Sequence, residues 1–562
     1  MTLALWAAFG CTKGSAGADA APPTAAPQAA AAPASVTPGS GGPGVAGPAS
    51  AEAGAKAPAP RRRTVLVVGP HPDDEVMVAG GRARAAVTAG DRVKLVLVTN
   101  GDSEMSPAHG LRRQGESVAA AKVLGLSEQD VVFLGYGDQT LIDMWKSTDG
   151  AKVFTSAAGQ SATYGERGLG GTDYHRRRTG SPAPYSRDAL LGDLKALIAE
   201  FQPDEIYTVN DWDYHPDHYA AVAFLTEALV AVRRAGGATN AALNQSMVWQ
   251  PTDCGPRYWP PQGGEPPFPP YPKPGCLDDT NLEWERIVRY PVPPEMQRPG
   301  EDRNMKSEAI LSYASQASDF LLSFARKDEF FWRTDFGHDL ALTARVSASS
   351  ETSSWPAAKA ADGFIDTRRC WVATDRAGAW IQLDWDASVR LGQVSLHGLL
   401  DAKEDAGAGR LTFSDGSAID VGRLPPKGRV LPVTFPPKVV KWVRFTFTAT
   451  AERAGLSEIF ALGAPAASTA NIPPHFVKGP VASPAAIRSA QTSTLSVEAH
   501  DLDGDQIQYH WIADGGSIRG SGPTATFTVP AVRAATTFTI TVRISDGRGG
   551  VAENSAFVTA SP

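Results

Sequence analysis

The feature that most constrains the fold is an apolar run at residues 64–69. The run reads Thr-Val-Leu-Val-Val-Gly and contains no charged residue. Such a continuous run is typical of a strand buried on both faces of a parallel sheet. It begins where a stretch rich in Ala, Pro and Gly ends. That stretch lacks the apolar periodicity needed for a core, so residues 1–63 are predicted to be a signal-like start and a linker.

Strands and helices alternate along residues 64–335. Further strands are predicted at residues 93–98, 131–134 and 205–209, with helical patterns between them. This alternation predicts an α/β domain built on a doubly wound, Rossmann-like sheet. Ligands of such sheets bind beyond the carboxyl ends of the strands, and polar clusters follow several of these ends in the sequence.

The pattern changes near residue 340 to short alternating strands separated by Gly, Pro and Asp. Residues 379–385 and 442–447 are examples. The alternation predicts two all-β sandwich modules, at residues 340–463 and 473–562.

The charge balance argues against a nucleic-acid partner. The chain has 53 Lys and Arg against 60 Asp and Glu, a formal net charge of −7. Proteins that bind nucleic acids usually carry a dense basic face, which this composition does not favour.

Cys11 follows the short apolar run at residues 3–10. This resembles the end of a bacterial lipoprotein signal, in which the cysteine is lipidated. We therefore expect an exported protein of the bacterial cell envelope or exterior, with membrane contact only through a lipid on Cys11. The alternative is a disordered tail with an incidental cysteine.

Two further cysteines flank a Pro-rich stretch. Cys254 and Cys276 could form a disulfide there, which an exported protein would permit. The sequence alone leaves open whether they are bridged.

The segment from Pro70 to Glu75 carries an imidazole and three carboxylates directly after the first strand. A catalytic zinc needs about three N or O ligands and an open position for water. His71 and Asp74 can point to one centre from a turn that opens into a helix. Asp73 is then placed to accept a proton from water.

A second cluster follows the fourth strand, at residues 211–218. His215 and His218 are three residues apart, so a helix that begins there places both on one face. The alternative is that Asp73 and Asp217 only cap helices, since Asp is favoured at N-caps. That alternative does not explain why three of the ten histidines of the chain lie in these two turns.

Residues 64–335 resemble the PIG-L/LmbE-like deacetylase family. The resemblance rests on several segments in the family's order. They are His71-Pro72-Asp73-Asp74-Glu75, Thr99-Asn100-Gly101, Arg113-Gln114-Gly115-Glu116, His215-Pro216-Asp217-His218, and a later stretch with Lys306, Tyr313 and Ser315-Gln316.

The resemblance implies a zinc site with His71, Asp74 and His218 as ligands and Asp73 as general base. His215 would stabilise the oxyanion or protonate the leaving amine. The implied reaction is hydrolysis of the acetamide of an N-acetylglucosamine-type sugar or glycoconjugate, with release of acetate.

Arg113 is the candidate for substrate contact within the resemblance. The alternative is that Arg113 forms an ion pair on the helix surface with Glu116 or another neighbour.

Two other functions stay open. One is a surface carbohydrate-binding lipoprotein whose deacetylase-like domain is inactive, although the complete set of site residues argues against it. The other is a small-thiol biosynthetic deacetylase, against which the linker and the β modules argue.

Residues 340–463 resemble the discoidin-like, coagulation-factor C-type sandwich. The resemblance implies a carbohydrate- or lipid-surface-binding module with a structural Ca²⁺ near Asp362 and Glu458. The alternative is that Asp362 only caps a turn. Residues 473–562 resemble an immunoglobulin/PKD-like module, where the run from Asp501 to Asp505 could bind calcium but as a hairpin turn needs none.

Overall fold

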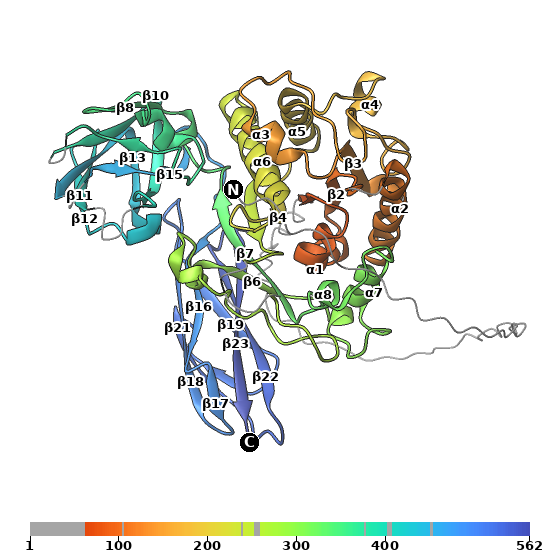
Figure 1. The fold of residues 1–562 in the computed structure, drawn as a ribbon. Helices are drawn as coiled ribbons and strands as arrows, with labels where there is room; N and C mark the ends of the chain where they lie inside the picture. Colours follow the sequence, from red (N-terminus) through yellow and green to blue (C-terminus); the bar gives the residue numbers. More distant parts are fainter. Residues whose placement is uncertain are drawn as a thin grey trace, which may run out of the picture. The chain divides into compact units, whose positions relative to one another are not determined.

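The computed structural model describes residues 62–103, 106–237, 240–251, 254, 259–375, 378–401, 407–449 and 453–562 (Figure 1). Cys11 and nearly all of the predicted linker lie outside these residues. The domain boundaries predicted from the sequence stay predictions.

A seven-stranded sheet organises the first part of the described chain. Its strand order is β3-β2-β1-β4-β5-β7-β6. The first five strands are parallel, whereas β7 runs antiparallel to β5 and β6 antiparallel to β7. The strands are β1 (Thr64–Gly69), β2 (Arg92–Thr99), β3 (Val131–Tyr136), β4 (Glu205–Val209), β5 (Ala242–Ser246), β6 (Val288–Pro291) and β7 (Asp328–Asp335).

Helices cover both faces of this sheet. The sequence of β1 is apolar throughout because its side chains enter a core on each face. Val65 and Val67 point into one core, and Leu66 and Val68 point into the other. The first core includes residues of α1, α2 and α7, and the second includes residues of α3, α5 and α6 (Figure 1). The prediction of a doubly wound α/β sheet is confirmed. The helices are α1 (Asp74–Thr88), α2 (Pro107–Val123), α3 (Leu141–Lys146), α4 (Tyr174–Thr179), α5 (Arg187–Phe201), α6 (Pro216–Arg234), α7 (Met305–Leu311) and α8 (Asp319–Leu322).

The next part of the chain is all-β, as predicted. A six-stranded sheet has the order β12-β11-β13-β10-β15, with β8 also paired to β10, and a short pair joins β14 to β9. These elements enclose a separate hydrophobic core. The strands are β8 (Arg345–Ala348), β9 (Trp371–Val372), β10 (Trp380–His397), β11 (Ala408–Phe413), β12 (Ala418–Val421), β13 (Val430–Ala449), β14 (Gly455–Leu456) and β15 (Glu458–Pro465).

The last part contains two four-stranded sheets around another core. Their orders are β16-β18-β21-β20 and β17-β23-β22-β19. The strands are β16 (His475–Ser483), β17 (Ala486–Arg488), β18 (Thr492–His500), β19 (Gln508–Ala513), β20 (Ser517–Arg519), β21 (Thr524–Thr528), β22 (Thr536–Ser545) and β23 (Val551–Ser561).

Among the described helices, none combines the length and the apolar character that crossing a membrane requires.

The disulfide considered from the sequence is not formed in this structure. Cys276 is a free thiol, so it is not bridged to Cys254. The carbonyl of Cys254 nevertheless lies against Gly275, the residue before Cys276.

Candidate metal centre

The first half of the centre lies on the turn between β1 and α1. The turn is tight, because a Cβ on Gly69 would come within 3.0 Å of the carbonyl oxygen of His71. Asp73 follows with a φ of 121°, and α1 begins at Asp74. The side chain of Asp73 makes no hydrogen bond that caps the helix. The turn therefore leaves the carboxylates of Asp73 and Asp74 available for roles other than capping the helix.

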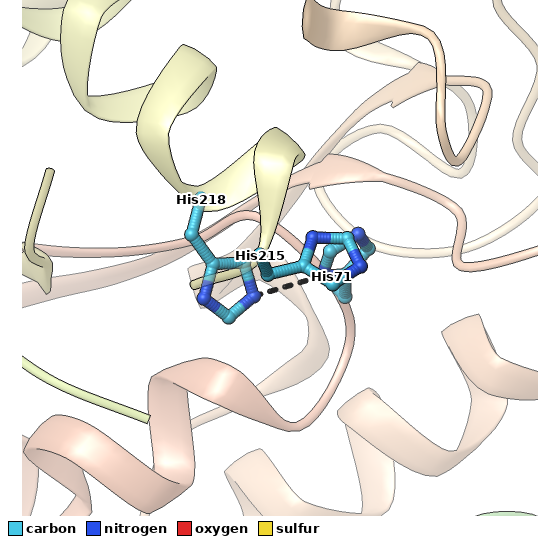
Figure 2. Close-up of side chains that lie close together, drawn as sticks. All are labelled: His71, His215 and His218. Atoms are coloured by element: carbon cyan, nitrogen blue, oxygen red, sulfur yellow. Dashed lines mark hydrogen bonds between the residues drawn. The ribbon is translucent and has the colours of Figure 1, made fainter. Parts of the chain in front are cut away.

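Three ligand atoms converge between this turn and α6. His71 Nδ1 lies 3.2 Å from His218 Nε2, and Asp74 Oδ2 lies 3.3 Å from His71 Nδ1 and 3.2 Å from His218 Nε2. Figure 2 shows the two imidazoles meeting at this point. A tetrahedral zinc with bonds of about 2.0–2.1 Å places neighbouring ligand atoms about 3.3 Å apart. The three predicted ligands therefore have the spacing that one shared zinc ion requires.

The outer nitrogen of each imidazole meets a carboxylate. His71 Nε2 lies 3.1 Å from Asp138 Oδ1, and His218 Nδ1 lies 3.1 Å from Asp213 Oδ1. Histidine ligands of metals usually donate their second N–H to such a group, which fixes the tautomer and aims the other nitrogen at the metal. Besides the spacing of the ligand atoms, these outer carboxylates are therefore a second feature of the site that fits a bound metal.

Sequence reasoning did not assign roles to Asp138 and Asp213. Asp213 lies inside the predicted cluster, and its Oδ2 accepts hydrogen bonds from the main-chain N–H groups of Val248 (2.8 Å) and Trp249 (2.9 Å). Asp138 follows the carboxyl end of β3, and its N–H donates to Asp102 Oδ1 at 2.9 Å. The rule that ligands bind at these strand ends was the signal that could have found Asp138.

The electrostatics of the centre favour positive charge. Burial alone would lower the pKa of His218, but Asp74 and Asp213 outweigh it and raise that pKa to about 10. Burial would raise the pKa of Asp74, but the neighbouring His218 and His71 hold it far below its usual value. Carboxylates and imidazoles packed in this way offer a divalent cation both charge and donor atoms.

Asp73 lies beside the ligands and is held by Arg113. Arg113 Nη2 lies 3.0 Å from Asp73 Oδ2, and the same guanidinium donates to the carbonyls of Gly101 and Pro72. Burial raises the pKa of Asp73 to about 7, Arg113 opposes this rise, and Asp74 adds to it. Asp73 is thus a buried carboxylate with one fixed cationic partner.

The surface ion pair considered for Arg113 and Glu116 is wrong. Glu116 pairs with Arg112 at 3.2 Å, while Arg113 is buried and contacts Asp73. Substrate contact by Arg113 stays a prediction.

His215 is the N-cap of α6. Its Nδ1 accepts a hydrogen bond from the N–H of Asp217 at 3.3 Å. Its ring centroid lies 4.7 Å from that of His71 and 4.8 Å from that of His218 (Figure 2). Burial and the two neighbouring imidazoles lower the pKa of His215 to about 4, so its ring is neutral near pH 7.

Asp217 does not cap α6 either. Its Oδ2 accepts a hydrogen bond from the N–H of Gln139 at 2.6 Å and lies 3.7 Å from His71 Nε2. The alternative in which Asp73 and Asp217 serve only as helix caps is therefore wrong.

At the centre, two other sets of donor atoms also lie within 4.8 Å of one another; elsewhere in the described residues, Asp501, Asp503 and Asp505 do so as well. One replaces Asp74 by His215, and the other combines His71 with Asp138 and Asp217. The second set uses the face of His71 where Asp138 already lies at 3.1 Å. The set of His71, Asp74 and His218 leaves both of its histidines an outer carboxylate, Asp138 for His71 and Asp213 for His218.

The predicted calcium residues lie in the all-β part that follows. The N–H of Asp362 donates to Glu458 Oε2 at 3.3 Å, and Asp362 Oδ2 lies 3.1 Å from Arg369 Nε and 3.5 Å from Lys359 Nζ. Both carboxylates are buried. Their role in binding calcium stays a prediction.

The aspartate run at residues 501–505 forms a turn that is closed by hydrogen bonds within the run. Asp501 Oδ1 accepts hydrogen bonds from the N–H groups of Asp503 at 2.9 Å and Asp505 at 3.1 Å. Asp503 also pairs with Arg390, and Asp505 with Arg548. These contacts agree with the interpretation as a turn.

Comparisons with known proteins agree with the resemblance found in the sequence. Residues 66–229 match the PIG-L family, described as GlcNAc-PI de-N-acetylase. Residues 339–462 match a domain of unknown function, DUF7402. No curated protein matches the chain.

Among solved structures, this chain is similar over 21–22% of its length to sugar-binding modules. A family 32 carbohydrate-binding module of C. perfringens NanJ, solved with galactose, is 18% identical and covers 21% of this chain and 92% of its own, with a TM-score of 0.19. A Streptococcus pneumoniae fucose-binding module is 15% identical over 22% of this chain and 96% of its own, at a TM-score of 0.20. A chitosan-binding module from Paenibacillus sp. IK-5 is 23% identical over 22% and 98%, at 0.19.

The converging ligand atoms, their outer carboxylates, Asp73 and His215 all fall inside the stretch that the family model matches, and residues 66–229 of this chain are a PIG-L domain.

Proposed function

We propose that the protein is a zinc-dependent N-deacetylase that hydrolyses the acetamide of an N-acetylglucosamine-type sugar or glycoconjugate. The observation that carries the proposal is the triangle of ligand atoms from His71, Asp74 and His218, with sides of 3.2–3.3 Å. Its place in a PIG-L domain supports the acetylated amino sugar as substrate.

Each residue of the centre has a defined task in this reaction. Zinc, when bound, supplies a water of lowered pKa and polarises the amide carbonyl. Asp73 accepts a proton from the attacking water, and Arg113 holds the carboxylate in place through the contact at 3.0 Å. As the C–O bond forms, His215 stabilises the negative charge on the carbonyl oxygen. The C–N bond then breaks, and the proton taken up by Asp73 leaves with the amine.

The direct test is acetate release by the full chain. N-acetylglucosamine and its β-1,4-linked oligomers serve as substrates, and the protein is measured as purified, after chelation, and after zinc is restored. We expect turnover that is lost on chelation and recovered with zinc. Turnover that is insensitive to chelation, or release of acetate from none of these sugars, would contradict the proposal.

We propose further that the enzyme is exported and acts at the cell envelope or outside. The support is the sequence around Cys11, which lies outside the described residues. In the native bacterium we expect the protein in the membrane fraction, with Cys11→Ala moving it to the soluble fraction without loss of activity. Recovery of wild-type protein with an intact N-terminus from the cytoplasm would contradict export.

A further inference from the structure

The main chain of Asp73 adopts a conformation that needs support. Its φ is 121° and its ψ is −34°, a region that residues with a side chain rarely occupy. Such a conformation is strained and persists only where the surroundings hold it. The residue proposed as the general base is therefore the strained residue of the turn.

One side chain holds the N–H of this residue. The N–H of Asp73 donates to Glu75 Oε2 at 3.0 Å. Glu75 is fully buried, with an exposed fraction of 0%. Because a buried N–H must be paired, the carboxylate of Glu75 favours the conformation that brings this N–H to it.

Glu75 is itself held by a residue far along the chain. Its Oε1 accepts a hydrogen bond from Tyr313 Oη, and Tyr313 is also fully buried. The two residues are 238 positions apart. Both oxygens of the Glu75 carboxylate are thus in use, one toward Tyr313 and one toward Asp73.

The segment that carries Tyr313 is fixed against the helices next to the centre. Ser315 donates from its N–H (2.9 Å) and its Oγ (2.6 Å) to the carboxylate of Glu116 on α2. On α7, the buried Lys306 pairs with Glu329, and Glu329 also accepts from the N–H of Gly81 on α1 at 2.7 Å. Tyr313 therefore approaches Glu75 from a rigid frame.

We propose that Glu75 and Tyr313 are positioning residues of the deacetylase site. Together they fix the main chain of Asp73 so that its carboxylate stays beside the metal centre. The proposal rests on the proposed function, since the position of Asp73 matters for turnover only if Asp73 acts on water. Neither residue supplies a ligand atom or a proton to the substrate.

The test compares Tyr313→Phe with Tyr136→Phe. Tyr136 is an equally buried tyrosine of the same domain whose Oη donates to Asp193 at 2.9 Å, in the core on the opposite face of the sheet. Zinc content, kcat, KM and thermal stability are measured on the same preparations. For Tyr313→Phe we expect full zinc content, unchanged KM and a kcat lowered by about ten- to a hundredfold, because small displacements of reacting groups have effects of this size. Tyr136→Phe should lose stability without this loss of kcat.

Conservative replacement separates position from charge. Glu75→Gln keeps an oxygen for the N–H of Asp73 and places an amide N–H₂ toward Tyr313, so it should retain more activity than Glu75→Leu. Activity lost equally in both variants would show that the charge of Glu75 is needed and would overturn a purely positioning role.

A readout independent of activity is hydrogen exchange at residues 69–77. We expect faster exchange in Tyr313→Phe than in wild type and in Tyr136→Phe. Unchanged exchange, an unchanged kcat, or zinc lost in parallel with activity would overturn the proposal. A wild-type protein that deacetylates no sugar would instead overturn the proposed function, and with it the catalytic part of this inference, even if the exchange result held.

Discussion

The candidate metal centre and the pair formed by Asp362 and Glu458 are both buried acidic sites, but they differ in what surrounds the carboxylates. At the centre, Asp74 Oδ2 faces two imidazole nitrogens at 3.2 and 3.3 Å. In the pair, Asp362 Oδ2 faces Arg369 and Lys359 instead. In the described part of the chain, no Lys or Arg pairs with Asp74, whereas Asp362 already has two cationic partners.

This difference shows why acidic residues in a motif do not by themselves identify a metal site. A carboxylate that faces imidazoles can bind a metal together with them, because the metal cation supplies the positive charge in place of the imidazole protons. A carboxylate next to a guanidinium already has that charge, so an added ion competes with the arginine. We therefore expect a strong metal site at the centre and a weak one at the pair.

The largest effect is expected from His218→Ala, which removes a corner of the triangle. Zinc should be depleted and activity lost by more than about a hundredfold, which exceeds the usual effect of changing an outer carboxylate. His215→Ala is the matched control from the same helix turn, and it should keep zinc while lowering the rate. Metal analysis and turnover on the same samples check this. If His215→Ala empties the site and His218→Ala leaves it filled, the ligand assignment is reversed.

Asp73→Asn should leave the metal in place and lower kcat by about 10²–10⁴-fold, because in the proposed reaction the carboxylate accepts a proton and is not a ligand. Asp73→Asn and His218→Ala should therefore differ in metal content, although both lower the rate. Zinc lost in step with activity would mean that Asp73 is a ligand.

Asp213→Asn tests the outer carboxylates. The amide can still accept from the main chain at Val248 and Trp249, but it supports the imidazole of His218 less strongly. We expect zinc affinity to fall by about 10–100-fold, measured by competition with a chelator. An unchanged affinity would show that the contact at 3.1 Å does not tune the metal.

The smallest effect is expected at Asp362 and Glu458. If calcium binds there, the competing Arg369 should keep Kd in the weak range of about 10⁻⁴–10⁻³ M. Calcium should then raise Tm of the full chain slightly, and Glu458→Gln should abolish the rise. A Tm that does not respond to millimolar calcium would remove the calcium proposal, and a Kd far below this range would refute our comparison of the two sites.

The fold and the core of the site were predictable from local patterns. The apolar run at residues 64–69 indicated a strand between two cores, and the cores on its two sides confirm it. The meeting of the turns that carry His71, Asp74 and His218 was predictable because the carboxyl ends of parallel strands share one edge of the sheet. The choice of His218 rather than His215 as a ligand came from the family resemblance.

Other parts of the site were not predictable from sequence, because they depend on which atoms pack together after folding. Asp138 joins the centre through a contact between residues 67 positions apart, and Tyr313 reaches Glu75 across 238 positions. Arg113 was expected at a surface or a substrate, yet it turns inward to Asp73.

The sequence by itself thus determined which turns carry the residues of the candidate site: His71, Asp73 and Asp74 after β1, and His215 and His218 after β4. Only the tertiary structure decided how those groups are oriented, since the carboxylates that face the two histidines, the support of the Asp73 main chain and the partners of Arg113 are set by buried contacts, several of them between distant segments. Periodicity and spacing report which face or strand end a residue occupies, whereas a contact of 3 Å depends on the packing of the whole domain.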